Sequence, residues 1–392
     1  MNHHFDEVID RKNPFSVKWG SLEKLFGSED VLPMWVADMD FENPEPVLAA
    51  LRKVLDNHVL GYMMPPDSLY EAIIHWQKER HQMILAKEDI LFSPGVVPSI
   101  GLIIQTFTQV NDAVMIHNPV YTPFSNMIEL NQRQCISSTL TIQDNQFKMD
   151  FADIEKKMVE QQVKLFILCN PQNPGGRVWS KKELTQLAEM CKKHDVLIIS
   201  DEIHGDLVFQ PESFTSLVTL DSSYQDFVLT LSAATKTFNL AGIKLSMVFV
   251  QNPKLRDQFI QAQNKIEQSA LNTFGYVGTE AAFSEGGPWL SDLMQYLSAN
   301  LELICTFFDK ELPQVRYMKP EGTYLFWFDC STLGMTDAEL ADHFAKVGKI
   351  GLNAGAAYGP AGSNYMRLNF AAPQSLIEEG LKRIKYAFEQ PH

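Results

Sequence analysis

The stretch that decides the fold reads TKTFNLAGIK, residues 235–244, and it lies between two apolar runs, FVLTL (227–231) and LSMVFV (245–250). Short β-rich apolar runs of this kind are typical of buried strands. Lys236 therefore follows the end of a predicted strand, and Lys244 stands at the edge of the next one. A lysine shielded from water at a strand end can lose its proton near neutral pH and bond covalently to a carbonyl compound. The stretch predicts a sheet with a reactive amine at its rim.

The same apolar pattern extends upstream, over about residues 88–250. Three further strand candidates alternate there with helical patterns: AVMIH (113–117), KLFILC (164–169) and VLIIS (196–200). Between them, Ser180 and Glu183 have the spacing of a capping box that opens an amphipathic helix. This alternation predicts an α/β fold with a largely parallel sheet covered by helices.

Outside this region the pattern changes. Upstream, Asn43 and Ser68 are the expected N-caps of two helices. Downstream, KPEGTYLFWFD (319–329) is strand-like but stands outside the alternation, which favours a smaller α+β domain. The length of 392 residues exceeds what one hydrophobic core usually supports. We therefore predict a large domain, residues 47–287, and a small domain made of residues 1–46 and 288–392.

Composition narrows the function classes. The net charge is −15, and no lysine- or arginine-rich cluster is present that would neutralise a row of phosphates, so nucleic acid is not an expected partner. The five cysteines are scattered and lack the spacing of metal ligands, so no metal site is expected and they are read as reduced thiols. No run of about 18 apolar residues occurs. We expect a cytoplasmic protein with no membrane association.

Polar residues follow several of the predicted strands, at the edge where open α/β sheets bind ligands. They are Asn118 to Tyr121, Asn170 to Gly176, Asp201 to His204, and Thr235 with Lys236. An amide, a carboxylate, a lysine and an aromatic ring therefore converge on one rim. A carboxylate can pair with a pyridinium nitrogen, and a tyrosine ring can stack on a flat heterocycle. This set predicts that Lys236 holds pyridoxal 5'-phosphate (PLP).

At this point the chain resembles a known family, the fold type I PLP-dependent enzymes, and within it the cystathionine β-lyase (C–S lyase) branch of the PatB/MalY type. The resemblance covers nearly the whole chain, in the family's order and spacing. It rests on nine motifs: MWVADMDF (34–41), GYMMPP (61–66), SPGVVPSI (93–100), NPVY (118–121), NPQNPGGRVW (170–179), SDEIHGDL (200–207), TKTFNLAGIK (235–244), EGTYLFW (321–327) and YMRLNFA (365–371).

The resemblance implies a role for each matching residue. Lys236 would carry the cofactor and take the α-proton of the substrate. Asp201 would pair with the ring nitrogen, and Asn173 would hydrogen-bond the ring's 3-oxygen. Tyr121 would stack on the ring. Arg367 would form a bidentate pair with the substrate carboxylate, next to Asn173.

The resemblance also implies a phosphate site. The backbone amides of Gly95, Val96 and Val97 would bind the phosphate at the start of a helix running from Pro98. Further ligands would be Thr235, Lys244 and Tyr62, the last reaching across a homodimer interface from the neighbouring subunit. The chain departs from the related aminotransferase pattern at Ala233, where that pattern has a serine. His204 stands where aspartate aminotransferases have a tyrosine and matches the C–S lyase branch.

Other interpretations stay open for single positions. Lys236 alone could be a loop lysine, Asp201 a helix N-cap, Tyr121 core filling and Arg367 half of a surface ion pair. Lys244 could simply edge a strand, and His204 could be a hydrogen-bonded structural histidine. Three residues of MWVADMDF are expected to shape the substrate side without a catalytic role, namely Trp35, Asp38 and Asp40, although Asp40 could instead cap a turn.

The expected activity is α,β-elimination on L-cystathionine or another cysteine S-conjugate, which yields a thiol, pyruvate and ammonia. An aminotransferase would use the same cofactor and the same base, so it remains an alternative. A second alternative is an added regulatory role through protein binding, because one member of the resembled family restrains a transcription activator.

Overall fold

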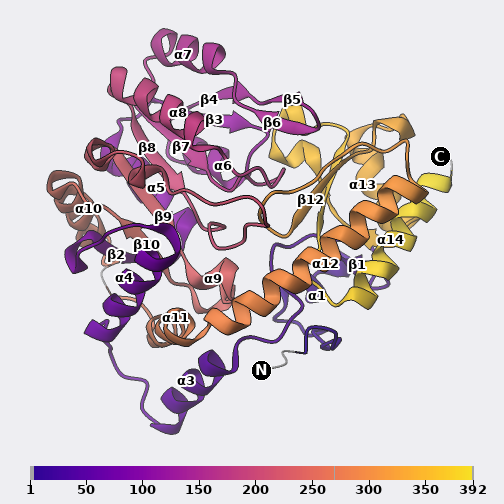
Figure 1. Ribbon diagram of the computed structural model, residues 1–392, viewed down its shortest axis with the longest axis horizontal. Helices are drawn as coiled ribbons and strands as arrows, with labels where there is room; N and C mark the ends of the chain where they lie inside the picture. The colour runs from indigo at the N-terminus through magenta and orange to yellow at the C-terminus, as the bar shows by residue number, and fades with distance from the viewer. Residues whose placement is uncertain (1–3, 269, 391–392) are drawn as a thin grey trace.

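The computed structural model describes residues 4–268 and 270–390, and its largest element is a seven-stranded mixed sheet (Figure 1). The strand order is β2-β10-β9-β8-β7-β3-β4. All neighbours pair in parallel except β10, which is antiparallel to both β2 and β9. The strands are β2 (Ile90–Ser93), β3 (Ala113–Asn118), β4 (Gln134–Thr139), β7 (Leu165–Cys169), β8 (Leu197–Asp201), β9 (Val228–Ser232) and β10 (Ser246–Phe249).

The five strands predicted from apolar runs are confirmed as β3, β7, β8, β9 and β10. Two strands at the sheet edges have no such signal. β4 reads QCISST and is only partly buried, so it contains no apolar run. β2 has four residues, ILFS, and is too short to show a periodicity. The largely parallel sheet of the prediction is therefore correct, and its two edges are additions from the structure.

Helices cover both faces of this sheet because its strands alternate apolar side chains between them. In β7, Leu165 and Ile167 pack with α5, α6 and α10, whereas Phe166 and Leu168 belong to the core on the opposite face. The covering helices are α4 (Asp67–His81), α5 (Val96–Phe107), α6 (Pro123–Leu130), α7 (Phe151–Glu160), α8 (Lys181–Lys193), α10 (Pro253–Lys265) and α11 (Thr273–Glu285), and α3 (Glu45–Asp56) packs on α11.

The N-caps observed at the helix starts agree only in part with those predicted from the sequence. The capping box of Ser180 and Glu183 is present at α8. The predicted caps Asn43 and Ser68 are wrong, because α3 and α4 are capped by prolines, Pro44 and Pro66, without a side-chain hydrogen bond. Asn43 instead donates through Nδ2 to the carbonyls of Phe238 and Asn239, 2.9 Å each. It ties the chain before α3 to the segment that follows Lys236.

The C-terminal part builds a separate antiparallel sheet of order β11-β12-β15-β14, at the right of Figure 1. The long helix α12 runs diagonally from the neighbourhood of α11 to this sheet. The elements here are α12 (Gly287–Glu311), β11 (Tyr317–Met318), β12 (Leu325–Asp329), α13 (Asp337–Lys346), β14 (Asn353–Ala354), β15 (Tyr365–Asn369) and α14 (Gln374–Glu389). The strand expected within 319–329 is confirmed as β12, and the division into domains at 46/47 and 287/288 stays a prediction.

Short elements complete the chain. They are α1 (Val17–Gly20), α2 (Leu22–Phe26), the pair β1 (Leu32–Pro33) and β13 (Ile350–Gly351), the hairpin of β5 (Thr141–Gln143) and β6 (Gln146–Lys148), and α9 (Ala234–Thr237). All five cysteines are free, as expected. Among the described residues, no helix is both long and apolar enough to cross a membrane.

The packing of α12 on the second sheet generates a prediction about stability. Phe308 is fully buried, and its ring lies 5.1 to 5.7 Å from those of Tyr317, Phe326 and Phe328. Phe308→Ala removes these contacts and leaves a cavity, so we expect a loss of about 3–5 kcal/mol in the free energy of unfolding. Phe307→Ala, at a half-buried position on the same helix, is the matched control for denaturant unfolding. Equal losses in the two variants would contradict this packing.

Candidate active site

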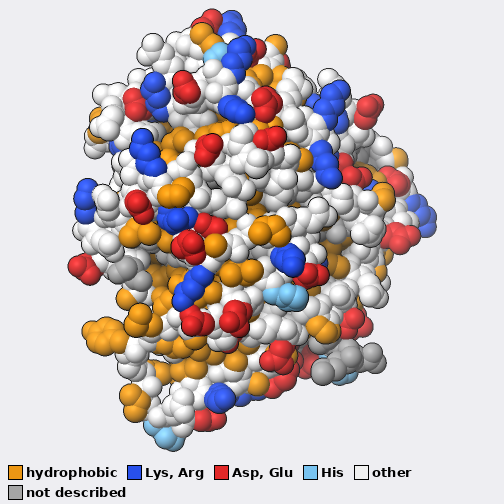
Figure 2. Space-filling view, turned by 60° about the vertical axis from the view of Figure 1, so that its left-hand side comes forward, with side chains coloured by type: hydrophobic (Ala, Val, Ile, Leu, Met, Phe, Trp, Pro, Cys, Tyr) orange, Lys and Arg blue, Asp and Glu red, His pale blue; other side chains and the backbone are white. Residues whose placement is uncertain are grey.

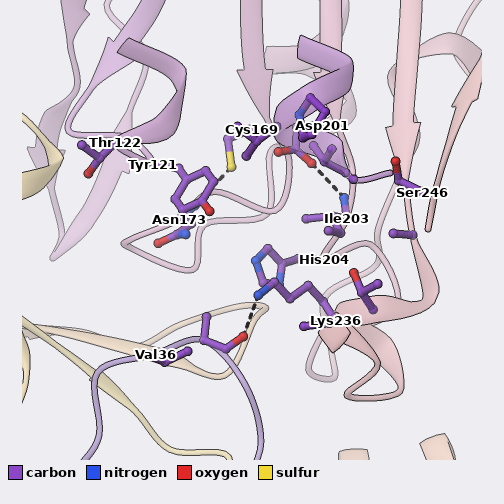
Figure 3. A pocket seen from close by; sticks show the side chains of 18 of the residues that line it. Val36, Tyr121, Thr122, Cys169, Asn173, Asp201, Ile203, His204, Lys236 and Ser246 are labelled. Atoms are coloured by element: carbon purple, nitrogen blue, oxygen red, sulfur yellow. Dashed lines mark hydrogen bonds between the residues drawn. The ribbon is translucent and has the colours of Figure 1, made fainter. Parts of the chain in front are cut away.

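A cavity of about 520 Å³ opens at the carboxyl ends of the parallel strands (Figure 3). β7 ends at Cys169 and β8 at Asp201, and these two residues are paired neighbours in the sheet. Figure 3 shows Tyr121, Asn173, Asp201 and Lys236 around one space, although they come from four different segments. The lining also includes Gly95, Val96, Val97, His204, Thr235, Lys244 and Arg367. All of the predicted site residues except Tyr62 therefore meet here.

Lys236 lies in α9, directly after β9, as its place behind the FVLTL run predicted. Its Nζ donates to the carbonyl oxygen of Ala37 over 2.6 Å. Burial lowers the pKa of Lys236 to about 8. The charges of Asp38 and Asp201 raise this pKa, and those of Arg367 and Lys244 lower it. The amine can therefore lose its proton near neutral pH, which a nucleophile or general base requires.

Asp201 is the deeply buried acid of the cavity. It is 3% exposed, and its Oδ1 accepts the N–H of Ile203 over 3.2 Å. Burial raises the pKa of Asp201 to about 7, and the charge of Glu202 adds to this effect. A carboxyl group in this position becomes a stable carboxylate when a cation is placed beside it. It is therefore suited to a protonated ring nitrogen.

Arg367 and Asn173 form one unit on another wall. Arg367 Nη1 donates to Asn173 Oδ1 over 2.9 Å, and Nη2 donates to the carbonyl of Trp35 over 2.8 Å. The guanidinium carbon lies 5.1 Å from the centroid of the Tyr358 ring. Both side chains are buried. These contacts orient the planar guanidinium, so that it can bind a carboxylate through two parallel hydrogen bonds.

The position of Asn173 depends on the glycine turn that follows it. Gly176 has φ +71°, and a Cβ there would lie 2.4 Å from Pro320 Cβ. The carbonyl of Gly176 accepts the N–H groups of Glu321 and Gly322, 2.9 Å each. Only glycine allows this close approach. The turn therefore fixes the Asn173 segment against the EGTY segment.

His204 is buried with its Nδ1 lacking a hydrogen-bond partner. Burial and the charges of Lys236 and Arg367 lower the pKa of His204 to about 3, so the ring is neutral. Its ring lies edge-on to that of Tyr324, 6.0 Å between centroids. A buried, unpaired ring nitrogen at a cavity wall is available to a bound ligand.

The start of α5, where the sequence predicts phosphate binding, forms another part of the cavity wall. The helix begins at Val96, two residues before the predicted Pro98, and Gly95 is its N-cap. The first N–H groups of a helix have no partner within it and attract anions. Thr235 and Lys244 line the same cavity, with Lys244 exposed in a left-handed conformation at φ 51°. Tyr121 completes the wall, and burial raises its pKa to about 12.

Tyr62 does not line this cavity. It lies in the connection between α3 and α4 and is fully exposed, as are large parts of Val59, Leu60 and Met64. Figure 2 shows hydrophobic side chains gathered at the lower left of the view. Within one chain, Tyr62 therefore contributes nothing to the site.

The motif MWVADMDF behaves only partly as expected. Trp35 lines the cavity, but Asp38 and Asp40 do not. Asp40 is buried and ion-paired with Lys18 at 2.6 Å, so its carboxylate balances a buried charge rather than capping a turn. Sequence reasoning also missed several polar lining residues. Thr122 and Cys169 are direct sequence neighbours of the predicted stretches Asn118 to Tyr121 and Asn170 to Gly176, which could have indicated them. Asn353 and Tyr358 lie outside the quoted motifs.

These observations test whether the residues fit PLP. The cavity offers a buried carboxyl group for a cationic ring nitrogen, an amine of lowered pKa, an unpaired His204 nitrogen and a helix N-terminus for a phosphate. Each of the four chemical features of the cofactor finds a matching group. The residues fit it.

Comparison with known proteins agrees with this fit. The chain is 41% identical to cystathionine beta-lyase PatB of Bacillus subtilis, over 98% of this chain and 99% of that protein. A PLP-bound putative aminotransferase from Clostridium difficile has a TM-score of 0.97 at 41% identity, covering 99% and 100% of the two chains. Cystalysin from Treponema denticola, which contains a pyridoxal 5'-phosphate cofactor, has a TM-score of 0.96 at 33% identity, covering 99% of each chain.

The model of the family "Aminotransferase class I and II" matches residues 29–384. This span includes every residue that lines the cavity. Together with the full-length relatives, it shows that the chain belongs to the aminotransferase class I and II family, with the fold of the PLP-bound C–S lyases.

Proposed function

We propose that this protein is a PLP-dependent C–S lyase that eliminates a thiol from L-cystathionine or a related cysteine S-conjugate and releases pyruvate and ammonia. The observation that carries the proposal is the shared cavity of Lys236, Asp201 and Arg367, with a base of pKa about 8, a buried acid and a carboxylate-binding guanidinium. The full-length similarity to PatB supports the lyase over other family activities.

Arg367 would bind the substrate α-carboxylate. Its hydrogen bonds to Asn173 and to the Trp35 carbonyl hold the guanidinium plane, so the substrate carboxylate meets a fixed pair of donors. This fixes one end of the amino acid. The α-carbon would then lie between Arg367 and the Lys236 amine.

Lys236 would remove the α-proton and, as the covalent attachment point, hold the cofactor between turnovers. Bound PLP supplies an electron-withdrawing ring that makes the α-proton acidic. The Ala37 carbonyl orients Nζ through its 2.6 Å hydrogen bond, so the lone pair of the neutral amine can face the substrate. After proton removal, the Cβ–S bond would break, and the sulfur would leave as a thiol by taking up a proton from the protonated Lys236 amine. The remaining three-carbon fragment would be released as aminoacrylate, which water hydrolyses to pyruvate and ammonia.

The other residues would hold the cofactor. Asp201 would pair with the ring nitrogen, Asn173 and His204 would lie beside the ring, and Tyr121 would stack on its face. The phosphate would bind the N–H groups of Gly95, Val96 and Val97, with Thr235 and Lys244 as side-chain ligands. Ala233 offers no hydroxyl there, so the backbone amides carry more of this binding.

A homodimer would complete the site. The partner subunit's Tyr62 would reach the phosphate, since Tyr62 is fully exposed within its own chain. The neighbouring Val59, Leu60 and Met64 are 64–84% exposed, and a second copy would cover them. The cytoplasmic location stays a prediction from the sequence.

Aminotransferase activity is the second candidate, favoured by the name of the similar Clostridium difficile protein. Both reactions use the same amine, acid and guanidinium. They differ in products, because an aminotransferase needs a 2-oxo acid and releases no thiol. A direct assay therefore separates them.

The first prediction concerns the reaction. With PLP and L-cystathionine but no 2-oxo acid, we expect pyruvate and free thiol in equal amounts. Lys236→Ala should reduce the rate at least about 100-fold, because the positioned base is lost. Product formation only after a 2-oxo acid is added would replace the lyase by the aminotransferase.

The second prediction concerns substrate binding. Arg367→Lys replaces a bidentate donor by a point charge, so KM for the amino acid should rise about tenfold or more. Steady-state kinetics measures this KM, and Arg316→Lys is the control, because Arg316 lies directly before β11 and does not line the cavity. An unchanged KM would remove Arg367 from the carboxylate site.

The third prediction concerns the dimer. Lys236→Ala and Tyr62→Ala chains are each expected to have low activity. Mixed dimers should regain activity, because one of their two sites then has both an intact Lys236 and a Tyr62 from the other subunit. If mixing two refolded variants restores nothing, Tyr62 does not act across the interface.

A further inference from the structure

The Lys236 amine donates a hydrogen bond to a loop, residues 35–41. Backbone carbonyl groups of this loop also accept hydrogen bonds from other side chains in and around the site. The Trp35 carbonyl accepts Arg367 Nη2, and the Ala37 carbonyl accepts both Lys236 Nζ at 2.6 Å and the Tyr324 hydroxyl at 2.9 Å. Asn369 Nδ2, two residues after Arg367, donates to the carbonyls of Val36 and Asp38. This loop has no regular secondary structure, so these contacts determine its shape.

Arg11, in the N-terminal segment, binds this loop through several hydrogen bonds. Its Nη1 donates to Asp40 Oδ1 over 2.6 Å and to the Met39 carbonyl over 3.0 Å. Its Nη2 donates to Asp38 Oδ2 over 2.8 Å. One guanidinium therefore bridges two carboxylates and a backbone carbonyl of the same loop.

A second cation, Lys18, completes the cluster. Its side chain is 1% exposed, and Nζ donates to Asp40 Oδ2 over 2.6 Å. The Trp19 indole N–H also donates to Asp40, over 2.9 Å. Arg11 and Lys18 thus balance the charges of Asp38 and Asp40. Lys18 Nζ also lies 3.6 Å from Asp38 Oδ1, so removing Arg11 would leave Lys18 as the single cation for two carboxylates beside the site.

We propose that Arg11 is a positioning residue for Lys236: it fixes the loop that holds the amine through the Ala37 carbonyl, and it neutralises Asp38, which lines a neighbouring cavity together with Lys236. The importance of this positioning for catalysis rests on the proposed function of Lys236, whereas the effect of Arg11 on the amine does not. It assigns a function to an N-terminal residue that does not line the cavity of Lys236 and Asp201.

The charged and titratable groups around Lys236 determine whether its pKa rises or falls when Arg11 is removed. They are Asp38 on the loop, Asp201 at the end of β8, Arg367 on β15 and Lys244 after α9, with His204 and Tyr324 beside them. Asp38 raises the pKa of Lys236. Without Arg11, Asp38 shares only Lys18 with Asp40, so its charge is less fully balanced, and a loosened loop admits more water. Both effects favour the protonated amine, so the pKa of Lys236 should rise.

The test reads the amine itself. The full chain is freed of cofactor with hydroxylamine, and competitive acetylation with acetic anhydride is followed by mass spectrometry of the peptide that contains Lys236. The wild-type midpoint should lie near pH 8. Arg11→Gln should raise it by about half a pH unit or more, and Arg11→Lys should give a smaller rise, because a point charge cannot bridge both carboxylates.

Two further variants separate positioning from general stability. Asp38→Asn should lower the midpoint, and Arg11→Gln combined with Asp38→Asn should return it toward the wild-type value. Arg316→Gln is the matched control, because Arg316 pairs with the buried Asp329 at 2.7 Å on the second sheet. It should destabilise the protein without moving the Lys236 midpoint.

An unchanged midpoint in Arg11→Gln, or an equal rise in Arg316→Gln, would overturn the proposal. A double variant as high as Arg11→Gln alone would also contradict the role of Asp38. Because no substrate is used, failure of the lyase assay and failure of this proposal are distinguishable.

Discussion

The structure of the site depends on one constraint, the burial of the Lys236 amine at the end of β9. An isolated ammonium group is costly to bury, so the amine is held near its neutral form and its surroundings have to balance charge within a small volume. The charges of Asp201 and Asp38 raise the pKa of this amine, and those of Arg367 and Lys244 lower it. The 2.6 Å hydrogen bond to Ala37 then fixes where the amine points.

The same hydrogen bond joins parts of the chain that are far apart in sequence. The 35–41 loop touches Lys236 from the central sheet and Arg367 from the second sheet, and Asn239 pairs with its Met39 through both N–H and carbonyl. These contacts are made to backbone atoms of the loop. The loop therefore fixes where the Lys236 and Arg367 side chains lie, and its own side chains take no part in these contacts. The Lys236 amine and the Arg367 guanidinium are consequently held at fixed positions relative to each other.

Much of the fold and of the site was predictable, because it follows from short patterns of neighbouring residues in the sequence. Apolar runs identified the inner strands, and the polar residues at their ends identified Asp201, Asn173 and Lys236. Edge strand β4 has no apolar run, and the capping by Pro44 and Pro66 displaced the expected caps at Asn43 and Ser68. The Arg11 and Lys18 contacts to Asp40 span 29 and 22 residues, and nothing in the local sequence indicates such pairing.

The account is tested most directly by locating the covalent attachment of the cofactor. The holoprotein is reduced with sodium borohydride, digested and analysed by mass spectrometry. We predict one phosphopyridoxyl group per chain, on the peptide that contains Lys236. Attachment at another lysine, such as the nearby Lys244, or no attachment in a protein that still binds PLP, would contradict the central claim.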